Sequence, residues 1–152
     1  MKQTLCAEAL GTLVLVMTVV GSGIMAEQLS GGSDGLALIG NALATGCILV
    51  VLITLFGPVS GAHFNPAVTL AFYFAKELSA PAALSYMVSQ IFGGFAGTVL
   101  AHMMFDIPLV QIATTERASL PLYGSEFIAT AGLLCVILFG RTYRPSSVPG
   151  LV

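Results

Sequence analysis

Charged residues are scarce in this chain. Only 8% of its 152 residues are Asp, Glu, Lys or Arg, and tryptophan is absent. A soluble domain usually carries about a quarter charged residues, so the composition argues against an ordinary water-exposed surface. Hydrophobic residues make up 57% of the chain, and the mean hydropathy is +0.98. We therefore expect a lipid bilayer as the main partner of the chain.

Basic residues, cysteines and histidines are also few. The net charge is -2, and no basic run is present that would neutralise phosphates, so no nucleic-acid partner is expected. Cys6, Cys47 and Cys135 lie inside apolar stretches without paired spacing, which argues against a disulfide framework or a zinc site. His63 and His102 have no third ligand at helical spacing, so neither a metal nor another cofactor is predicted.

Four apolar stretches are long enough to cross a bilayer core of about 30 Å, which takes roughly 20 helical residues. They cover residues of about 5–26, 36–57, 82–104 and 122–140. The apolar stretch 58–76 is about half as long and is interrupted by Pro58, Gly61 and Pro66, which favours a re-entrant segment. The expected fold class is an all-α membrane protein, with residues 1–152 in a single domain.

The re-entrant segment contains a strong helix start. Asn65 is a favoured N-cap and Pro66 a favoured first helical residue, so a short helix is predicted from Asn65 to about Ala75. Lys76 then suits the negative end of the helix dipole. The positive end and the Asn65 amide would face the protein interior, where they disfavour cations and protons and favour neutral hydrogen-bond acceptors. An Asn-Pro-Ala tripeptide alone fits an ordinary capped helix as well.

The surrounding decapeptide is more specific. Ser60-Gly61-Ala62-His63-Phe64-Asn65-Pro66-Ala67-Val68-Thr69 resembles the first signature loop of the aquaporin and glycerol-facilitator (major intrinsic protein) superfamily at nearly every position. The resemblance extends to residues 7–12, to Ser89-Gln90 and to Gly93-Gly94, and so covers essentially the whole chain. It points to a bacterial-type member, truncated after its fourth transmembrane helix.

The resemblance implies a helical bundle of six spans in two inverted repeats, each with one half-helix. This chain would hold the first repeat, with three spans and one re-entrant half-helix, and the first span of the second repeat. Two Glu-x-x-x-Thr patterns, Glu8 with Thr12 and Glu126 with Thr130, support the repeat at an offset of 118. The same offset places a second half-helix near residue 183, beyond Val152, so the second pore loop and its filter arginine are expected to be absent.

The resemblance also assigns roles in the first pore loop. Asn65 looks like the first pore asparagine, with Pro66 and Ala67 as its helix start. His63 resembles the buried histidine that packs this part of the pore. Gly61 and Ala62 would offer backbone carbonyls to a single-file path.

Three further residues receive roles outside that loop. Thr45, about twenty residues before the pore asparagine, matches the outer constriction, and its small side chain predicts a wider pore. Glu8 and Glu126 are carboxylates inside spans, where a charge is costly. By the resemblance they brace the pore loops, and a proton relay is the alternative.

The predicted function is a passive transmembrane channel, as a subunit or a fragment, for water and small neutral solutes such as glycerol or neutral metalloid acids. An alternative is a non-conducting truncated product that lacks the second pore loop. An intramembrane enzyme would need a nucleophile beside a base, for which Ser60 and His63 are the nearest candidates; we expect no enzymatic activity. A complete channel of this kind is expected to be a homotetramer.

The orientation is predicted from Lys and Arg, which accumulate on the cytoplasmic side. With the N-terminus inside, Lys2, Lys76, Arg141 and Arg144 are cytoplasmic, and Arg117 alone is outside. We therefore expect a multi-pass protein of the cell (inner) membrane with a cytoplasmic N-terminus. The half-helix would then enter from the cytoplasmic face.

Overall fold

The computed structural model describes residues 1–112, 118–143 and 147, and it divides into two compact units, Met1–Leu109 and a second that begins at Val110. The described residues form five α-helices and no strand, which confirms the all-α prediction. Helices α1, α2, α4 and α5 are each long and apolar enough to cross a membrane. The chain is therefore a multi-pass membrane protein.

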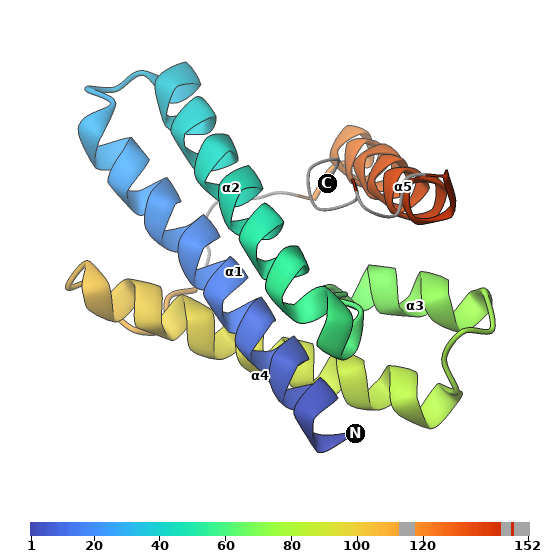
Figure 1. Ribbon diagram of the computed structural model, residues 1–152. Helices are drawn as coiled ribbons and strands as arrows, with labels where there is room; N and C mark the ends of the chain where they lie inside the picture. Colours follow the sequence, from blue (N-terminus) through green and yellow to red (C-terminus); the bar gives the residue numbers. More distant parts are fainter. Residues whose placement is uncertain (113–117, 144–146, 148–152) are drawn as a thin grey trace. The chain divides into compact units, whose positions relative to one another are not determined.

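Helices α1 (Lys2–Leu29) and α2 (Asp34–Ser60) form an antiparallel hairpin (Figure 1). Both extend beyond the predicted spans, because a helix can continue past the hydrocarbon core wherever its flanking side chains reach water. Gly31 and Gly32 have positive φ values of 60° and 87° and make the turn between the helices. Ser33 then caps α2 by accepting a hydrogen bond from Leu36 N.

Helix α2 runs through Pro58, where the sequence predicted the start of the re-entrant stretch. That boundary was wrong. A proline inside a helix removes one donor, and a membrane helix tolerates the loss when the surrounding backbone remains paired. The helix ends instead at Gly61, which adopts the left-handed conformation at φ 87° and donates its N–H to Gly57 O at 3.0 Å.

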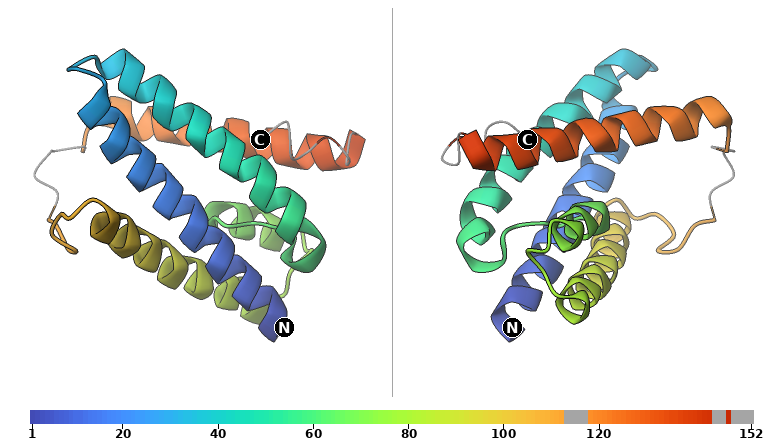
Figure 2. Two further views of the ribbon diagram at one scale, coloured as in Figure 1. Left: turned by 60° about the vertical axis from the view of Figure 1, so that its left-hand side comes forward. Right: turned by 90° about the vertical axis from the view of Figure 1, so that its right-hand side faces the viewer.

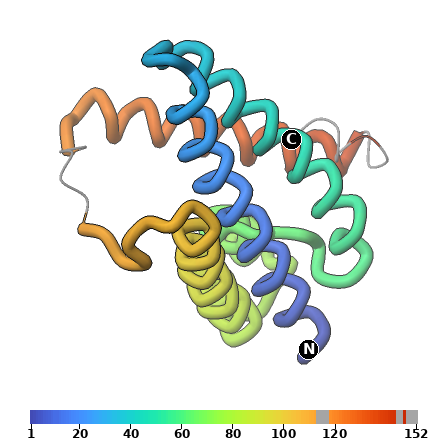
Figure 3. Tube along the Cα trace, turned by 90° about the vertical axis from the view of Figure 1, so that its left-hand side faces the viewer, coloured from blue at the N-terminus to red at the C-terminus, as the bar shows by residue number. Residues whose placement is uncertain are grey.

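Helix α3 (Pro66–Phe74) has 9 residues, which corresponds to about 14 Å and is too short to cross a bilayer. It packs against α4 (Ala80–Met104), and α4 in turn packs against α1. Figure 2 shows α3 beside α4, and Figure 3 views α4 nearly end-on with α1 crossing it.

The crossing of α1 over α4 depends on two glycines of α4. A Cβ atom on Gly93 would overlap Ala9 O, and one on Gly97 would overlap Leu13 O. Both obstacles are backbone atoms, which cannot move aside as a flexible side chain can. The small residues therefore let the two backbones approach closely, as in other membrane helix pairs.

The second unit contains α5 (Leu120–Tyr143). Gly140 is the buried residue of this helix, and Glu126 is exposed on its surface. Arg117 and Arg144, which the orientation prediction used, lie outside the described residues.

Candidate functional site

The candidate site is the loop between α2 and α3, which has an unusual backbone. Gly61, Ala62 and Phe64 have φ values of 87°, 51° and 46°. Left-handed geometry costs a glycine little, but at a non-glycine residue it costs about 1–3 kcal/mol and persists only where neighbouring groups enforce it. The loop therefore needs an external support.

Glu8 of α1 supplies that support. Its side chain is 0% exposed, and its carboxylate accepts four hydrogen bonds. Oε1 accepts from Ser60 Oγ at 2.5 Å and His63 N at 3.1 Å, while Oε2 accepts from Phe64 N and Gln90 Nε2, both at 2.8 Å. Two of these donors are backbone groups of the loop itself. A buried carboxylate of this kind is stable only because its acceptor positions are filled.

Phe64 locks the same loop through packing. Its side chain is buried, and its ring meets Phe56 edge-on with 6.0 Å between centroids. A Cβ atom on Gly11 would overlap the Phe64 ring, so the glycine of α1 leaves the space that the ring fills. Glu8 and Gly11 lie one turn apart on α1, and together they hold Phe64 by its backbone and by its side chain.

Thr69 links this support to α3. Its Oγ1 accepts from Gln90 Nε2 at 2.9 Å and donates to Asn65 O at 3.2 Å. It also lies 3.1 Å from His63 Nδ1. Since the single hydroxyl proton is used on Asn65 O, the best-satisfied arrangement has His63 protonated at Nδ1 and donating to Thr69. Hydrogen bonds thus run without a break from Glu8 through Gln90 and Thr69 to Asn65, the N-cap of the half-helix.

Asn65 begins α3 as the sequence predicts. Its backbone is extended, its Oδ1 accepts from Ala67 N at 2.7 Å, and Pro66 follows. The cap uses only the oxygen of the amide. Among the described residues no acceptor reaches Asn65 Nδ2, so the half-buried side chain keeps a donor group at the positive end of the helix.

Ser60 and His63 have structural partners. The Ser60 hydroxyl donates to Glu8 and accepts from Ala62 N at 3.1 Å. The ring of His63 is buried and lies 4.3 Å from the ring of Phe72 and 5.2 Å from that of Tyr86, centroid to centroid. These contacts give both side chains a role in holding the loop.

Two residues of the network received no role from the sequence. Gln90 is 1% exposed and bonds both Glu8 and Thr69, and the Tyr86 hydroxyl donates to Ser60 O at 2.8 Å. A signal was present, because Tyr86, Gln90, Gly93 and Gly97 recur at helical spacing on one face of α4.

Four further residues received roles from the sequence: Thr45, Glu126, Gly61 and Ala62. Thr45 is half-buried on α2, where its Oγ1 donates to Asn41 O at 2.8 Å. Glu126 belongs to the second unit, and its bracing role stays a prediction. Gly61 is exposed and Ala62 half-buried, and their role in a solute path stays a prediction, as does that of Thr45.

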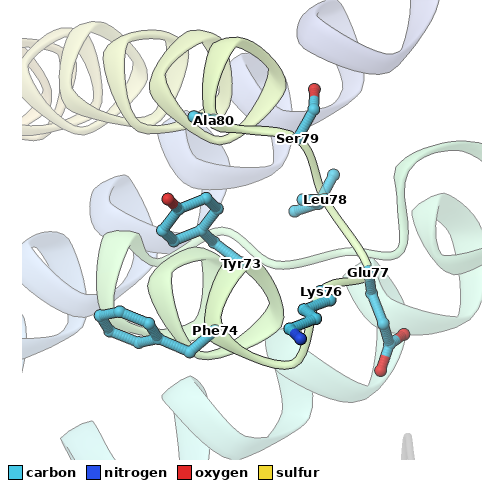
Figure 4. Close-up of a pocket in the computed structure, with 7 residues that line it drawn as sticks. All are labelled: Tyr73, Phe74, Lys76, Glu77, Leu78, Ser79 and Ala80. Carbon is cyan, nitrogen blue, oxygen red and sulfur yellow. The ribbon is translucent and has the colours of Figure 1, made fainter.

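The other end of α3 carries a pocket of about 610 Å³ (Figure 4). In that view Leu78 points toward the Tyr73 ring, whereas the carboxylate of Glu77 points away from it. Lys76 and Ser79 also line this pocket. The polar and charged end of α3 therefore lies opposite the Asn65 end.

Comparison with known proteins identifies the family. The family model described as major intrinsic protein matches residues 1–150. The chain belongs to the major intrinsic protein family. This confirms the resemblance that the loop sequence carries.

Several relatives are similar over nearly the whole chain. "Aquaglyceroporin AqpS" of Rhizobium meliloti (strain 1021) is 49% identical over 146 residues, covering 96% of this chain and 62% of the relative. "Aquaporin Z" of Photorhabdus laumondii is 34% identical, covering 95% and 67%. "Probable aquaporin PIP2-8" of Arabidopsis thaliana is 30% identical, covering 98% and 57%. The chain thus spans about 60% of the length of the curated relatives it matches.

Proposed function

We propose that this member of the major intrinsic protein family contributes the first pore loop of a passive channel for water and small neutral solutes. The observation that carries the proposal is the Glu8 network, which holds a strained loop and leaves Asn65 Nδ2 as an unused donor at the positive end of α3. A fixed donor at one point of a membrane protein suits a solute that accepts hydrogen bonds.

Electrostatics favours neutral solutes at that point. The N-terminus of α3 carries a partial positive charge of about half an elementary charge, which repels cations and protons. The four hydrogen bonds to Glu8 make it a brace for the loop rather than a proton relay, because none of its acceptor positions is left for a moving proton. A hydroxyl or water oxygen would accept from Asn65.

The other loop residues have supporting roles in this proposal. Pro66 and Ala67 start the helix, and the buried His63 ring packs against the loop. Gly61 and Ala62 offer backbone carbonyls that accept hydrogen bonds from a passing solute. Thr45 of α2 forms part of the outer constriction, where a small side chain admits small polyols such as glycerol or neutral metalloid acids besides water. Glu126 would brace a second loop in the same way as Glu8.

The proposed location is the inner cell membrane with a cytoplasmic N-terminus. Tyr73, Lys76 and Glu77 at the end of α3 suit the headgroup region, where aromatic and charged side chains gather, and Lys76 favours the cytoplasmic side. Asn65 would then lie deep in the membrane. By the family resemblance, the complete channel is a homotetramer.

The substitution Asn65→Asp tests the proposal in the product of the complete reading frame. Asp keeps the capping oxygen for Ala67 N but replaces the amide donor with an acceptor. We expect water and glycerol flux into proteoliposomes to fall at least about tenfold, an effect of the size that one specific polar contact confers, with unchanged thermal stability in detergent. Unchanged flux at equal insertion would remove Asn65 from the pore.

The wild-type measurement decides between the proposal and its alternative. Flux above that of empty liposomes supports a conducting channel, and the absence of flux in a folded, inserted sample supports a non-conducting product.

Asn65→Ala is the matched folding control for Asn65→Asp. It removes the capping oxygen as well as the donor and is expected to lower the stability by about 1 kcal/mol.

Orientation is tested separately by single cysteines in a variant whose three native cysteines are replaced. Cysteine introduced as Lys76→Cys should react with a membrane-impermeant maleimide only from the cytoplasmic side, as should Lys2→Cys. Labelling of Lys76→Cys from the outside would show that α3 and its flanking loops cross the membrane.

A further inference from the structure

A second polar contact between two membrane-spanning helices joins α2 to α1 near Thr45. Asn41 lies one turn before Thr45, and its Nδ2 donates to Val19 O of α1 at 2.9 Å. Only the NH₂ group of an amide can donate a hydrogen bond to a carbonyl. This contact therefore assigns the positions of Nδ2 and Oδ1 in the Asn41 side chain. The Oδ1 atom of Asn41 therefore faces away from Val19.

Gly23 makes room for this amide. A Cβ atom on Gly23 would lie 2.8 Å from Asn41 Nδ2, which is too close for a carbon beside a nitrogen. The glycine of α1 and the asparagine of α2 are thus matched in shape, although they are 18 residues apart in sequence. The orientation of the amide is set by the helix pair and is not free to rotate toward other partners.

Asn41 and Thr45 also form a ladder along α2. Thr45 Oγ1 donates to Asn41 O at 2.8 Å, and it lies 3.5 Å from Asn41 Oδ1. A hydroxyl has one proton, and the shorter contact to the backbone takes it. Thr45 Oγ1 and Asn41 Oδ1 are then two acceptors one turn apart, and among the described residues no donor closer than 3.5 Å reaches Oδ1.

From these contacts we infer that Asn41 is a second specificity-determining residue at the outer constriction. Its Oδ1 and Thr45 Oγ1 form a pair of acceptors that selects solutes with several hydroxyl groups over water. This inference rests on the proposed function, because it takes Thr45 to line the solute path. It deepens that proposal by naming the chemistry of the solute: a neutral molecule that donates hydrogen bonds from adjacent hydroxyls.

The acceptors complement the donors of the inner loop. Asn65 Nδ2, at the positive end of α3, binds solute oxygens, whereas the ladder on α2 binds solute hydrogens. A polyol can satisfy both in turn, since each hydroxyl donates and accepts. A bulky apolar side chain at position 41 or 45 would remove the acceptors for the solute hydroxyls.

The simpler role for Asn41 is to join two helices, as buried amides often do in membranes. That role predicts a loss of stability when Asn41 is replaced, but no change in the ratio of glycerol to water permeability. The ratio therefore separates the two roles, because it compares two solutes in one sample.

The test measures glycerol and water permeability of the product of the complete reading frame in proteoliposomes. We expect Asn41→Leu to lower the glycerol-to-water ratio about fivefold, the effect of losing one hydrogen bond of ordinary strength. Gly23→Ala should lower the ratio in the same direction without touching α2, because it displaces the amide. Thr45→Val should lower it as well, and the Asn41→Leu/Thr45→Val double variant should lose less than the product of the two single effects.

Two matched controls accompany these variants. Thr54→Val removes the same intrahelical bond on α2, in which Oγ1 donates to Val50 O at 2.6 Å, at an exposed position. Gly40→Ala adds a methyl group that meets Ala26 Cβ at an ordinary 3.5 Å. Neither control should change the ratio.

An unchanged ratio in Asn41→Leu and Gly23→Ala would overturn the inference and leave Asn41 as a helix-joining residue. The proposed function would still stand if Asn65→Asp abolished flux in the same preparation. Absence of wild-type flux overturns both. If Asn41→Leu does not insert into the membrane, Gly23→Ala decides the test, because it keeps every polar group of α2.

Discussion

The same five-residue pattern occurs twice in this chain and meets two different surroundings. Glu8 and Thr12 of α1 are both buried, and the Glu8 carboxylate binds four donors. Glu126 of α5 is exposed, and Thr130 is half-buried. The patterns are alike, but among the described residues the Glu8 carboxylate is buried against a loop and a glutamine, whereas Glu126 is exposed. Whether a carboxylate in this pattern is buried therefore depends on the donors that surround it. The sequence pattern alone shows only where such donors are expected.

Replacing each carboxylate is the strongest test of this comparison. Glu8→Leu would leave Ser60 Oγ, two loop amides and Gln90 Nε2 without their acceptor, and each unmet donor costs about 1–3 kcal/mol. We expect a loss of at least about 4 kcal/mol, or no folded protein at all. Glu126→Leu, tested in this same 152-residue chain, should leave stability unchanged, because Glu126 is exposed in it. Reversible unfolding in mixed SDS micelles, followed by circular dichroism, measures both.

The variant Glu8→Gln refines that result. Glutamine keeps the shape of the side chain and one acceptor oxygen, but its NH₂ group replaces the second oxygen and faces donors that previously bonded to that oxygen. Its stability should lie between those of the wild type and Glu8→Leu. Equal stability of Glu8→Leu and Glu126→Leu would contradict the bracing role of Glu8.

Close helix packing gives a second contrast between the two units. Gly93→Ala would push a methyl group into Ala9 O and force α1 away from α4, at a cost of about 1–3 kcal/mol. Gly94→Ala, in the same helix, adds a methyl group at 3.6 Å from Val16 Cγ2, which is ordinary contact. Gly132→Ala in α5 would meet no described atom within 4 Å. Thermal unfolding in detergent should therefore show a loss for the first variant alone.

A smaller midpoint shift for Gly93→Ala than for Gly94→Ala would show that α1 and α4 can separate freely. The glycine contact would then have no part in holding Glu8 against the loop. The Gly132 variant serves as a measure of what an alanine does at a helix position where no described atom lies within 4 Å of the added methyl group.

Local features of the fold could be predicted from the sequence, and long-range partners could not. The apolar blocks indicate four spanning helices, and Asn65-Pro66 defines the start of α3 because capping depends only on neighbouring residues. Pro58 was the misleading signal: a single missing donor does not end a helix, whereas the left-handed Gly61 does. The end of α2 therefore lies at the glycine.

The parts of the site that sequence reasoning missed depend on contacts between distant segments. Glu8 was assigned to bracing only through the family resemblance, and its partners Phe64 N and Gln90 Nε2 lie 56 and 82 residues away along the chain. The fit of Gly11 against the Phe64 ring, and of Gly23 against Asn41, is likewise invisible in local sequence. Such pairs become apparent only when helix register and crossing are known.

The smallest expected effect concerns the second residue of the pattern. Thr12 is 5% exposed, yet its Oγ1 has no hydrogen-bond partner within the part of the chain that the structure describes. A buried hydroxyl without a partner costs free energy, and replacing it with a methyl group removes that cost while keeping the branched shape. We therefore expect Thr12→Val to be neutral or to stabilise the protein by up to about 1 kcal/mol in SDS unfolding. Thr69→Val is the matched control, since that hydroxyl bonds Gln90 and Asn65 O and its loss should destabilise. A clear loss of stability in Thr12→Val would show instead that Thr12 Oγ1 has a partner in the membrane, such as a bound water, and that both residues of the first pattern are held by polar contacts.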